Sequence, residues 1–204
     1  ETGNRIIHFE KGDYQGSDFE TPQHILDATV RALESGYVRY DPGPGLPELR
    51  EYIATETMKE RRPGTKPEEV IITAGAKNAL TMTLLSILED GDEVVFPNPG
   101  YPPDEVWAKY ANAKIHHTPL RKEDWQYDLP KLDEMITDKT KLLIINTPQR
   151  PNGQIVENPE AIAEIVLKHP NLLVITDEIF SQVIYDGQKH KTISSIPEMK
   201  DRCI

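Results

Sequence analysis

The chain has 204 residues, of which 37% are hydrophobic and 28% charged, a composition typical of a globular protein with one sizeable core. Its 23 basic and 34 acidic side chains give a formal net charge of −11, which argues against non-specific nucleic-acid binding, because that requires a basic surface. One cysteine excludes an intrachain disulfide and a cysteine-based metal site, and no apolar run approaches the ~20 residues of a membrane span, so we expect no metal, no membrane partner and a cytoplasmic location.

The first 44 residues differ from the rest of the chain. Glu1–Gly3 lack the basic and apolar regions of a signal peptide. The stretch Gly12–Pro22 is loop-like, and clustered apolar residues predict a helix over Gln23–Leu33. The segment Tyr40–Gly45 is rich in turn residues. We therefore expect residues 1–44 to form an N-terminal arm or part of a small domain, and residues 45–204 to belong to a large α/β domain.

In residues 45–204, predicted helices alternate with short apolar runs typical of strands. The helices are expected at Leu46–Arg61, Asn78–Leu88, Pro103–Ala111, Lys131–Ile136 and Pro159–Lys168. The strands are expected at Val70–Thr73, Glu93–Phe96, Lys114–His117, Leu142–Ile145, Leu172–Thr176 and Gln182–Tyr185. Strands separated by helices require crossover connections, so we predict a mostly parallel sheet in a three-layer α/β/α arrangement. The last segment, Asp201–Ile204, is strand-like, and a sheet that stops there is expected to be incomplete at its C-terminal side.

Two segments stand where a predicted strand gives way to a helix, which is where α/β sheets bind ligands. The small residues of Thr73–Asn78 would let helix N-terminal N–H groups approach an anion such as a phosphate, although for this segment alone a plain strand-to-helix turn is the better explanation. No GxGxxG motif is present, which disfavours a nucleotide site. In Pro97–Pro103, prolines stiffen a loop that displays Tyr101, either for stacking on a planar ligand or as a buried turn residue.

Two further segments follow the most apolar strands. Asn146–Gly153 is a polar loop fixed by prolines and a glycine. Asp177 follows Leu172–Ile175, and a carboxylate at the buried end of a strand is costly unless it is paired. A protonated pyridine nitrogen would be a suitable partner, and a helix N-cap is the alternative. The four segments occur in order at successive strand ends, which favours a common ligand.

These segments together resemble the class I/II aminotransferases, pyridoxal-phosphate (PLP) enzymes of fold type I. The matching motifs are Asp18–Pro22, Tyr40 with Gly45–Arg50, Thr73–Leu80, Pro99–Pro102, Asn146–Gly153 and Asp177–Phe180. Their order and spacing are those of the family over nearly the whole chain. The resemblance implies that residues 45–204 are the N-terminal part of a large PLP-binding domain.

The resemblance also implies roles for individual residues. The backbone N–H groups of Gly75, Ala76 and Lys77 would bind the cofactor phosphate, and Tyr101 would stack on the pyridine ring. Asp177 would pair with the pyridinium nitrogen, so that the ring acts as an electron sink. Tyr101 and Asp177 are thus the predicted catalytic residues.

Two more residues complete the predicted set. Tyr40 would reach the phosphate of a neighbouring subunit, which implies a homodimer with shared sites, and Asn146 would orient the ring or the substrate. The amino-acid substrate would be bound in part by Gln15–Phe19, which departs from the family's usual Gly-Glu-Pro-Asp-Phe.

Two residues depart from the family pattern around the cofactor's phenolic oxygen. Arg150 stands in place of an asparagine, and Phe180 in place of a tyrosine, so both usual neutral partners of that oxygen are missing. Arg150 is predicted to bind the cofactor through a charge-assisted bond to this oxygen; a bound substrate carboxylate or solvent is the alternative partner. The Schiff-base lysine is expected beyond Ile204, because Lys189, Lys191 and Lys200 come too early in the pattern.

The sequence therefore predicts a PLP-dependent enzyme acting at the α-carbon of an amino acid, with transamination as the expected reaction. The departures at Arg150 and Phe180 leave β- or γ-elimination or replacement on a specialised amino acid open. A non-catalytic, aminotransferase-like binding module is the alternative outside enzymes.

Overall fold

The computed structural model describes residues 20–204 and divides the chain into two compact units, Glu1–Pro42 and Gly43–Ile204. In the first unit, helix α1 (Gln23–Glu34) confirms the helix expected at Gln23–Leu33, and Ser35 ends it. The motif residues Asp18 and Phe19 and the substrate loop Gln15–Phe19 lie outside the described residues. Between residues 20 and 204, no helix has the length and apolar character needed to cross a membrane.

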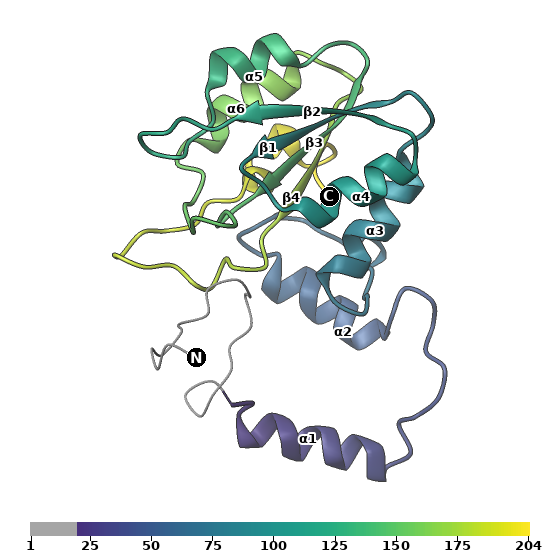
Figure 1. Ribbon diagram of the computed structural model, residues 1–204. Coiled ribbons are helices and arrows are strands. Elements are labelled where there is room, and N and C mark those ends of the chain that lie inside the picture. The colour runs from purple at the N-terminus through teal and green to yellow at the C-terminus, as the bar shows by residue number, and fades with distance from the viewer. Residues whose placement is uncertain (1–19) are drawn as a thin grey trace, which may run out of the picture. The chain divides into compact units, whose positions relative to one another are not determined.

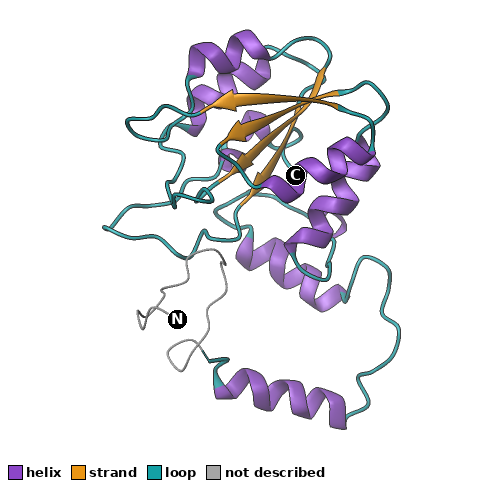
Figure 2. Cartoon of the chain, viewed as in Figure 1, coloured by secondary structure: helices purple, strands orange, loops and turns teal. Residues whose placement is uncertain are grey.

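The second unit is built on a four-stranded parallel sheet with the strand order β2-β1-β3-β4. The strands are β1 (Glu93–Asn98), β2 (Lys114–Pro119), β3 (Thr140–Asn146) and β4 (Leu173–Asp177). The main helices are α2 (Pro47–Tyr52), α3 (Ala76–Ile87), α4 (Pro102–Tyr110), α5 (Leu129–Met135) and α6 (Pro159–Leu167). Figure 2 shows the strands between helices, which confirms the predicted α/β class.

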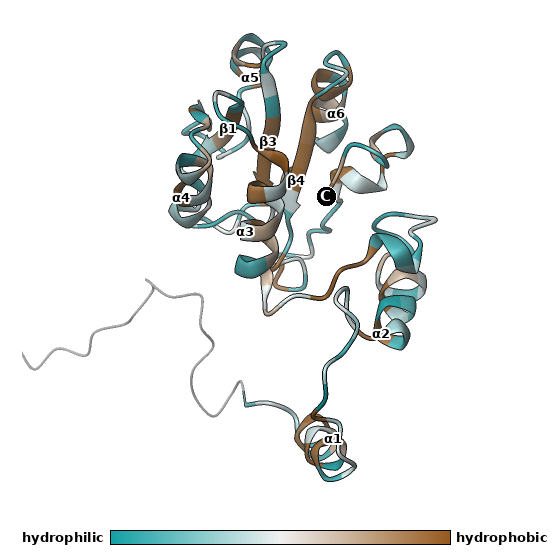
Figure 3. Cartoon of the chain, turned by 90° about the vertical axis from the view of Figure 1, so that its right-hand side faces the viewer, coloured by the Kyte–Doolittle hydropathy of each residue, from teal (hydrophilic) through white to brown (hydrophobic). Residues whose placement is uncertain are grey.

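Two apolar clusters pack on opposite faces of this sheet and define three layers. Residues of α3 and α4, such as Leu84 and Ala108, pack against one face of β1 and β3. Residues of α5 and α6, such as Leu132 and Ile162, pack against the other face. Figures 1 and 3 show the helices on both sides of the strands, with strongly apolar segments in β3 and β4. Strands that are buried on both faces explain the continuous apolar runs in the sequence.

The last residues of the chain pair with β4. Cys203 forms a parallel bridge with Val174, and the Thr176 N–H donates to the Ile204 carbonyl at 3.0 Å. The strand-like segment expected at Asp201–Ile204 therefore adds to the sheet beside β4.

Two predicted strands are wrong. Val70–Thr73 pairs with no strand among residues 20–204; instead the Ile72 N–H donates to the Pro44 carbonyl at 2.8 Å. Gln182–Tyr185 contains a turn, closed by the Val183 N–H donating to the Phe180 carbonyl at 2.7 Å. An apolar run forms a strand only where a neighbour accepts its backbone hydrogen bonds, and local composition does not report that neighbour.

The helix expected at Leu46–Arg61 is shorter and changes type. It is α-helical over α2, continues as a π-helical turn, η2 (Ile53–Thr57), and ends at Met58. Arg61 lies beyond this end, in a turn, and its side chain reaches the segment that follows β4.

Candidate cofactor site

A cavity of about 280 Å³ lies at the carboxyl ends of β3 and β4, where parallel sheets place their ligands. The β3–β4 register pairs Asn146 with Asp177, so both strands end beside this cavity. It is lined by Gly75, Ala76, Lys77, Leu80, Tyr101, Asn146, Arg150, Asp177, Ile179 and Phe180. Among residues 20–204, every predicted site residue except Tyr40 is therefore brought to one place.

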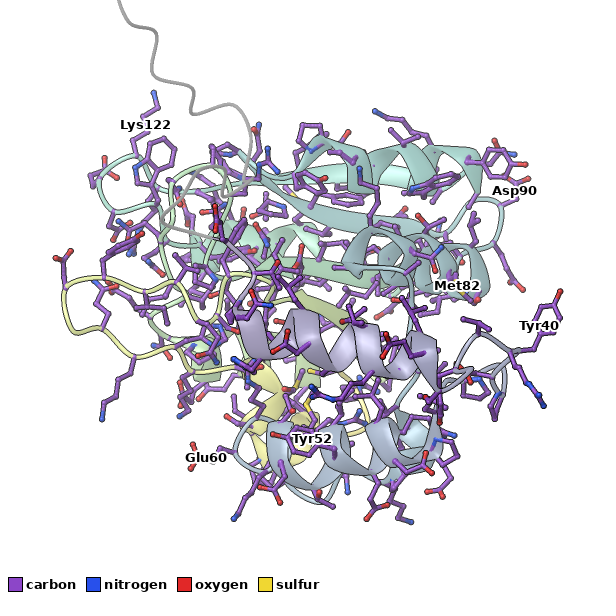
Figure 4. The ribbon with its side chains drawn as sticks, turned by 90° about the horizontal axis from the view of Figure 1, so that it is seen from below. Tyr40, Tyr52, Glu60, Met82, Asp90 and Lys122 are labelled. Atoms are coloured by element: carbon purple, nitrogen blue, oxygen red, sulfur yellow. The ribbon has the colours of Figure 1, made fainter. Side chains whose placement is uncertain are left out.

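Tyr40 does not line this cavity. It belongs to the unit Glu1–Pro42, and its side chain is fully exposed. Figure 4 shows the ring projecting away from its backbone. Its predicted role requires a second subunit and stays a prediction.

A larger, more open hollow of about 860 Å³ lies at the opposite edge of the sheet, where β2, β3 and β4 begin. Two of its charged groups pair with each other: the Lys141 ammonium lies 2.8 Å from the Asp92 carboxylate. Its lining contains neither an aromatic side chain nor a buried carboxylate. The smaller cavity is therefore the better candidate for chemistry.

The N-terminus of α3 forms one wall of the cavity. Gly75 caps the helix with φ +84°, a conformation that favours glycine, and a Cβ atom placed there would meet nothing within 4 Å. The first N–H groups of a helix have no intrahelical acceptor, so those of Ala76 and Lys77 are available to an anion. The Gly75 N–H instead donates to the Thr73 carbonyl at 2.8 Å. Two of the three predicted phosphate donors are therefore suitably placed, while the third closes the turn.

Tyr101 forms a second wall, at the start of α4. The loop before it is tight, because a Cβ atom on Gly100 would lie 2.4 Å from the Pro97 carbonyl oxygen. The Gln149 side chain donates to the Pro99 carbonyl at 2.8 Å and joins this loop to the one after β3. The Arg150 guanidinium carbon lies 5.1 Å from the centre of the Tyr101 ring, within the range of a cation–π contact.

Asn146 fastens the loop after β3 to β4. Its Nδ2 donates to the Asp177 carbonyl at 3.2 Å, and its Oδ1 accepts the Arg150 N–H at 2.7 Å. The Thr147 N–H also donates to the Asp177 carbonyl, at 2.9 Å. The amide thus holds Arg150 and Asp177 in a fixed relation, a positioning function that the sequence alone did not indicate.

Asp177 is the buried carboxylate of the cavity, with 8% of its surface exposed. Burial raises the pKa of its carboxyl above the ordinary value, the Ile179 N–H at 3.2 Å opposes this, and the charge of Glu178 adds to it. No helix begins directly after Asp177, because residues 179–182 form turns, so the N-cap interpretation is wrong. A cationic N–H donor would relieve the cost of this buried charge.

The remaining walls are apolar. Leu80, Ile179 and Phe180 line the cavity together with the Tyr101 ring. Apolar walls with a few convergent polar groups are typical of small-molecule sites. A flat aromatic ring with an anionic arm and a protonated ring nitrogen matches this lining, so the residues present fit PLP.

None of the three candidate lysines near the end of the chain lines the cavity. Lys191 pairs with Glu160, and the Lys200 ammonium donates to the Gly64 carbonyl at 3.0 Å. Lys189 is likewise outside the lining residues. Their placement agrees with the expectation that none of them carries the cofactor.

Arg61 braces the segment that follows Asp177, and the sequence did not predict this contact; we call it the Arg61 brace. The Arg61 guanidinium donates to the Ser181 hydroxyl at 2.7 Å and to the Glu178 carboxylate at 3.5 Å. Glu178 accepts a further bond from the Thr176 hydroxyl at 3.0 Å, and the Ser194 hydroxyl donates to the Arg61 carbonyl at 3.0 Å. These partners lie more than a hundred residues from Arg61 in the sequence, so no local pattern could have revealed them.

Comparison with known proteins agrees with this site. The family model "Aminotransferase class I and II" matches residues 4–203. The aspartate aminotransferase of Geobacillus stearothermophilus is 36% identical over 99% of this chain and 51% of its own length. The crystal structure of the aromatic aminotransferase from Pyrococcus horikoshii OT3 superimposes with a TM-score of 0.85 at 37% identity, covering 91% of this chain and 51% of that one.

A Thermus thermophilus aspartate aminotransferase double mutant also has a TM-score of 0.85, at 31% identity over 91% of this chain and 48% of its own. The chain spans about half the length of the curated relatives it matches. Because the family model matches nearly every residue, the chain belongs to the class I and II aminotransferase family.

Proposed function

We propose that this chain supplies the cofactor-binding wall of a PLP-dependent aminotransferase. The observation that carries the proposal is the convergence of an anion-binding helix N-terminus, an aromatic ring and a buried carboxylate on one cavity of about 280 Å³. These are complementary to the phosphate, the ring and the ring nitrogen of PLP. When bound, PLP supplies an electron-withdrawing ring that stabilises negative charge at the α-carbon of an amino acid.

In this proposal each residue acts on a different part of the cofactor. The N–H groups of Ala76 and Lys77 bind the phosphate, helped by the dipole of α3. Tyr101 packs against the ring. Asp177 holds a proton on the ring nitrogen, because an ionised carboxylate in an apolar cavity stabilises a cationic partner strongly. Asn146 keeps the loops of Asp177 and Arg150 in register.

The wider architecture belongs to the same proposal. Residues 1–44 would form an N-terminal arm or part of a small domain, and residues 45–204 the first part of the large PLP-binding domain. The substrate would be an amino acid, as the names of the aspartate and aromatic aminotransferases suggest for those relatives. Tyr40 would complete the site of a partner subunit in a homodimer, and the enzyme would act in the cytoplasm.

The lining of the cavity also supports a second candidate reaction. Arg150 and Phe180 both line the cavity, so the atypical residues face the ligand rather than solvent alone. A changed environment of the ring could favour β- or γ-elimination or replacement over transamination. Product analysis separates the two: a 2-oxo acid together with an aminated acceptor indicates transamination, whereas ammonia or a new side-chain bond indicates the alternative.

The proposal is tested on the protein expressed from its full-length gene. PLP is added to the cofactor-free protein, binding is followed by absorbance, and amino-group transfer from a panel of amino acids to 2-oxoglutarate is measured. We expect Asp177→Asn to lose cofactor affinity and transfer, and Asp138→Asn, a change at an exposed carboxylate far from the cavity, to retain both. Binding that is equal in both variants would contradict the assignment of Asp177.

A further inference from the structure

The cavity carries positive charge on two separate elements. One is the N-terminus of α3 with Lys77, and the other is Arg150, in the loop after β3. We infer that Arg150 is a second anion-binding group of this cavity, which binds an anionic oxygen distinct from the phosphate. The inference rests on the proposed function, and the oxygen belongs either to the phenolic group of the cofactor or to the carboxylate of the amino-acid substrate.

Arg150 is held at the cavity by its surroundings rather than extended from a loose loop. Its N–H donates to the Asn146 side chain at 2.7 Å, and the neighbouring Gln149 N–H donates to the Gln154 carbonyl at 2.7 Å. The Gln149 side chain also binds the Pro99 carbonyl, on the loop that carries Tyr101. The backbone of Arg150 is therefore fixed from both sides.

The side chain of Arg150 lies beside the surface that we assign to the ring. Its guanidinium carbon is 5.1 Å from the centre of the Tyr101 ring, and both residues line the cavity. A guanidinium carries its N–H groups in a planar fork that matches a carboxylate or phenolate oxygen. A ligand that stacks near Tyr101 would lie within reach of these donors.

Apart from the N-terminus of α3, few other groups of this cavity can donate a hydrogen bond to an anion. The Asn146 amide already holds the Asp177 carbonyl and the Arg150 N–H, Phe180 has no polar atom, and Asp177 is an acceptor when ionised. In an apolar cavity, a bond between the Arg150 guanidinium and an anionic oxygen is stronger than the same bond in water.

The two sources of the oxygen predict different behaviour. If Arg150 binds the phenolic oxygen, it stabilises the ionised form, so the cofactor's absorbance titrates at lower pH than it would without the cation. If Arg150 binds the substrate carboxylate, the cofactor titration is independent of it, and the affinity for carboxylic acids depends on it.

The test uses the holoenzyme produced from the full-length gene, with Arg150→Met and Arg150→Lys. Methionine keeps an apolar chain against Tyr101 and removes the charge, whereas lysine keeps the charge. Arg121→Met is the matched control, because Arg121 pairs with Asp124 on the surface, outside the cavity. Two quantities are measured: the pH midpoint of the visible absorbance of the bound cofactor, and the dissociation constant of succinate as a substrate-like carboxylate.

We expect Arg150→Met to move one of these quantities by about tenfold or more, that is, by about one pH unit or a tenfold weaker succinate affinity, and Arg150→Lys to restore most of it. A moved midpoint identifies the phenolic oxygen, and a weakened succinate affinity identifies the carboxylate. If both quantities in Arg150→Met match those of Arg121→Met, the inference is overturned while the proposed function stands. If the unsubstituted protein binds no PLP, the proposed function itself fails, and the inference falls with it.

Discussion

Replacing Asp177 by asparagine should stabilise the cofactor-free protein while it weakens cofactor binding. The carboxylate is 8% exposed and accepts the Ile179 N–H at 3.2 Å. Burial raises the pKa of Asp177 above its ordinary value of 3.8, so its ionised form is less favourable in the folded protein than in the unfolded chain. Stability is therefore lost as the pH rises from 3.8 through the raised value, and the loss is complete above it.

The magnitude follows from what asparagine keeps and what it removes. Its side chain has nearly the same shape, and its Oδ1 can accept the same bond from Ile179, so packing and hydrogen bonding are retained. The desolvation cost of a buried charge disappears. We expect the free energy of unfolding at pH 7 to rise by about 1 kcal/mol, a size common for substitutions that relieve an unfavourable functional site. This gain should shrink as the pH falls toward 3.8.

Urea unfolding of the cofactor-free protein at pH 7 and at pH 3.8, the ordinary pKa of this carboxyl, measures this prediction, with Asp138→Asn as the control. Asp138 is fully exposed, so its replacement should leave stability nearly unchanged at both pH values. A lower stability of Asp177→Asn at pH 7 would refute the reasoning, because it would mean that the carboxylate stabilises the fold. A gain that is equal at both pH values would show that relief of charge is not its cause.

Three further substitutions probe the residues that support the cavity. Arg61→Met removes the bonds to Ser181 and Glu178 and leaves a carboxylate that is largely buried without its cation, so we expect a loss of about 2 kcal/mol in unfolding free energy and weaker PLP binding. Glu178→Gln in the Arg61→Met background should recover part of this loss, as a double-mutant cycle in urea would show. Gly100→Ala places a methyl group 2.4 Å from the Pro97 carbonyl oxygen, so we expect a loss of about 2 kcal/mol, and an unchanged urea midpoint would contradict this contact.

The sheet could be predicted because its strands are buried on both faces. Runs such as Leu142–Ile145 alternate between the two apolar clusters, with Leu142 and Ile144 on one side and Leu143 and Ile145 on the other. Such a strand must be apolar at every position, and a continuous run of β-branched and leucine side chains between polar loops is a strong local signal. The positions of Asn146 and Asp177 could then be predicted as well, because each is the last residue of its strand.

The features that the sequence did not predict correctly depend on partners that are distant in the sequence. Val70–Thr73 has the composition of a strand but no ladder neighbour among residues 20–204, and its backbone bonds go to Pro44 and to the Arg50 side chain instead. The Arg61 brace joins residues more than a hundred positions apart. Neither the presence of a neighbouring strand nor a long-range ion pair leaves a periodic trace in the sequence.

Some residues of this site are held by the sheet and others by loops, and this difference decides which of them can be substituted without disturbing the fold. Asp177 is placed by the β3–β4 ladder, and a one-residue slip of that register would turn every buried side chain of β4 to the wrong face. Arg150 and Phe180 lie in connecting segments, where a change of side chain need not disturb the core. The position of Asp177, the proposed partner of the ring nitrogen, should therefore be insensitive to loop substitutions, whereas the environment on the Arg150 side can change by single substitutions. On this reasoning the sheet fixes the carboxylate that we propose binds the cofactor, and the loops at its carboxyl edge set the surroundings of the proposed reaction.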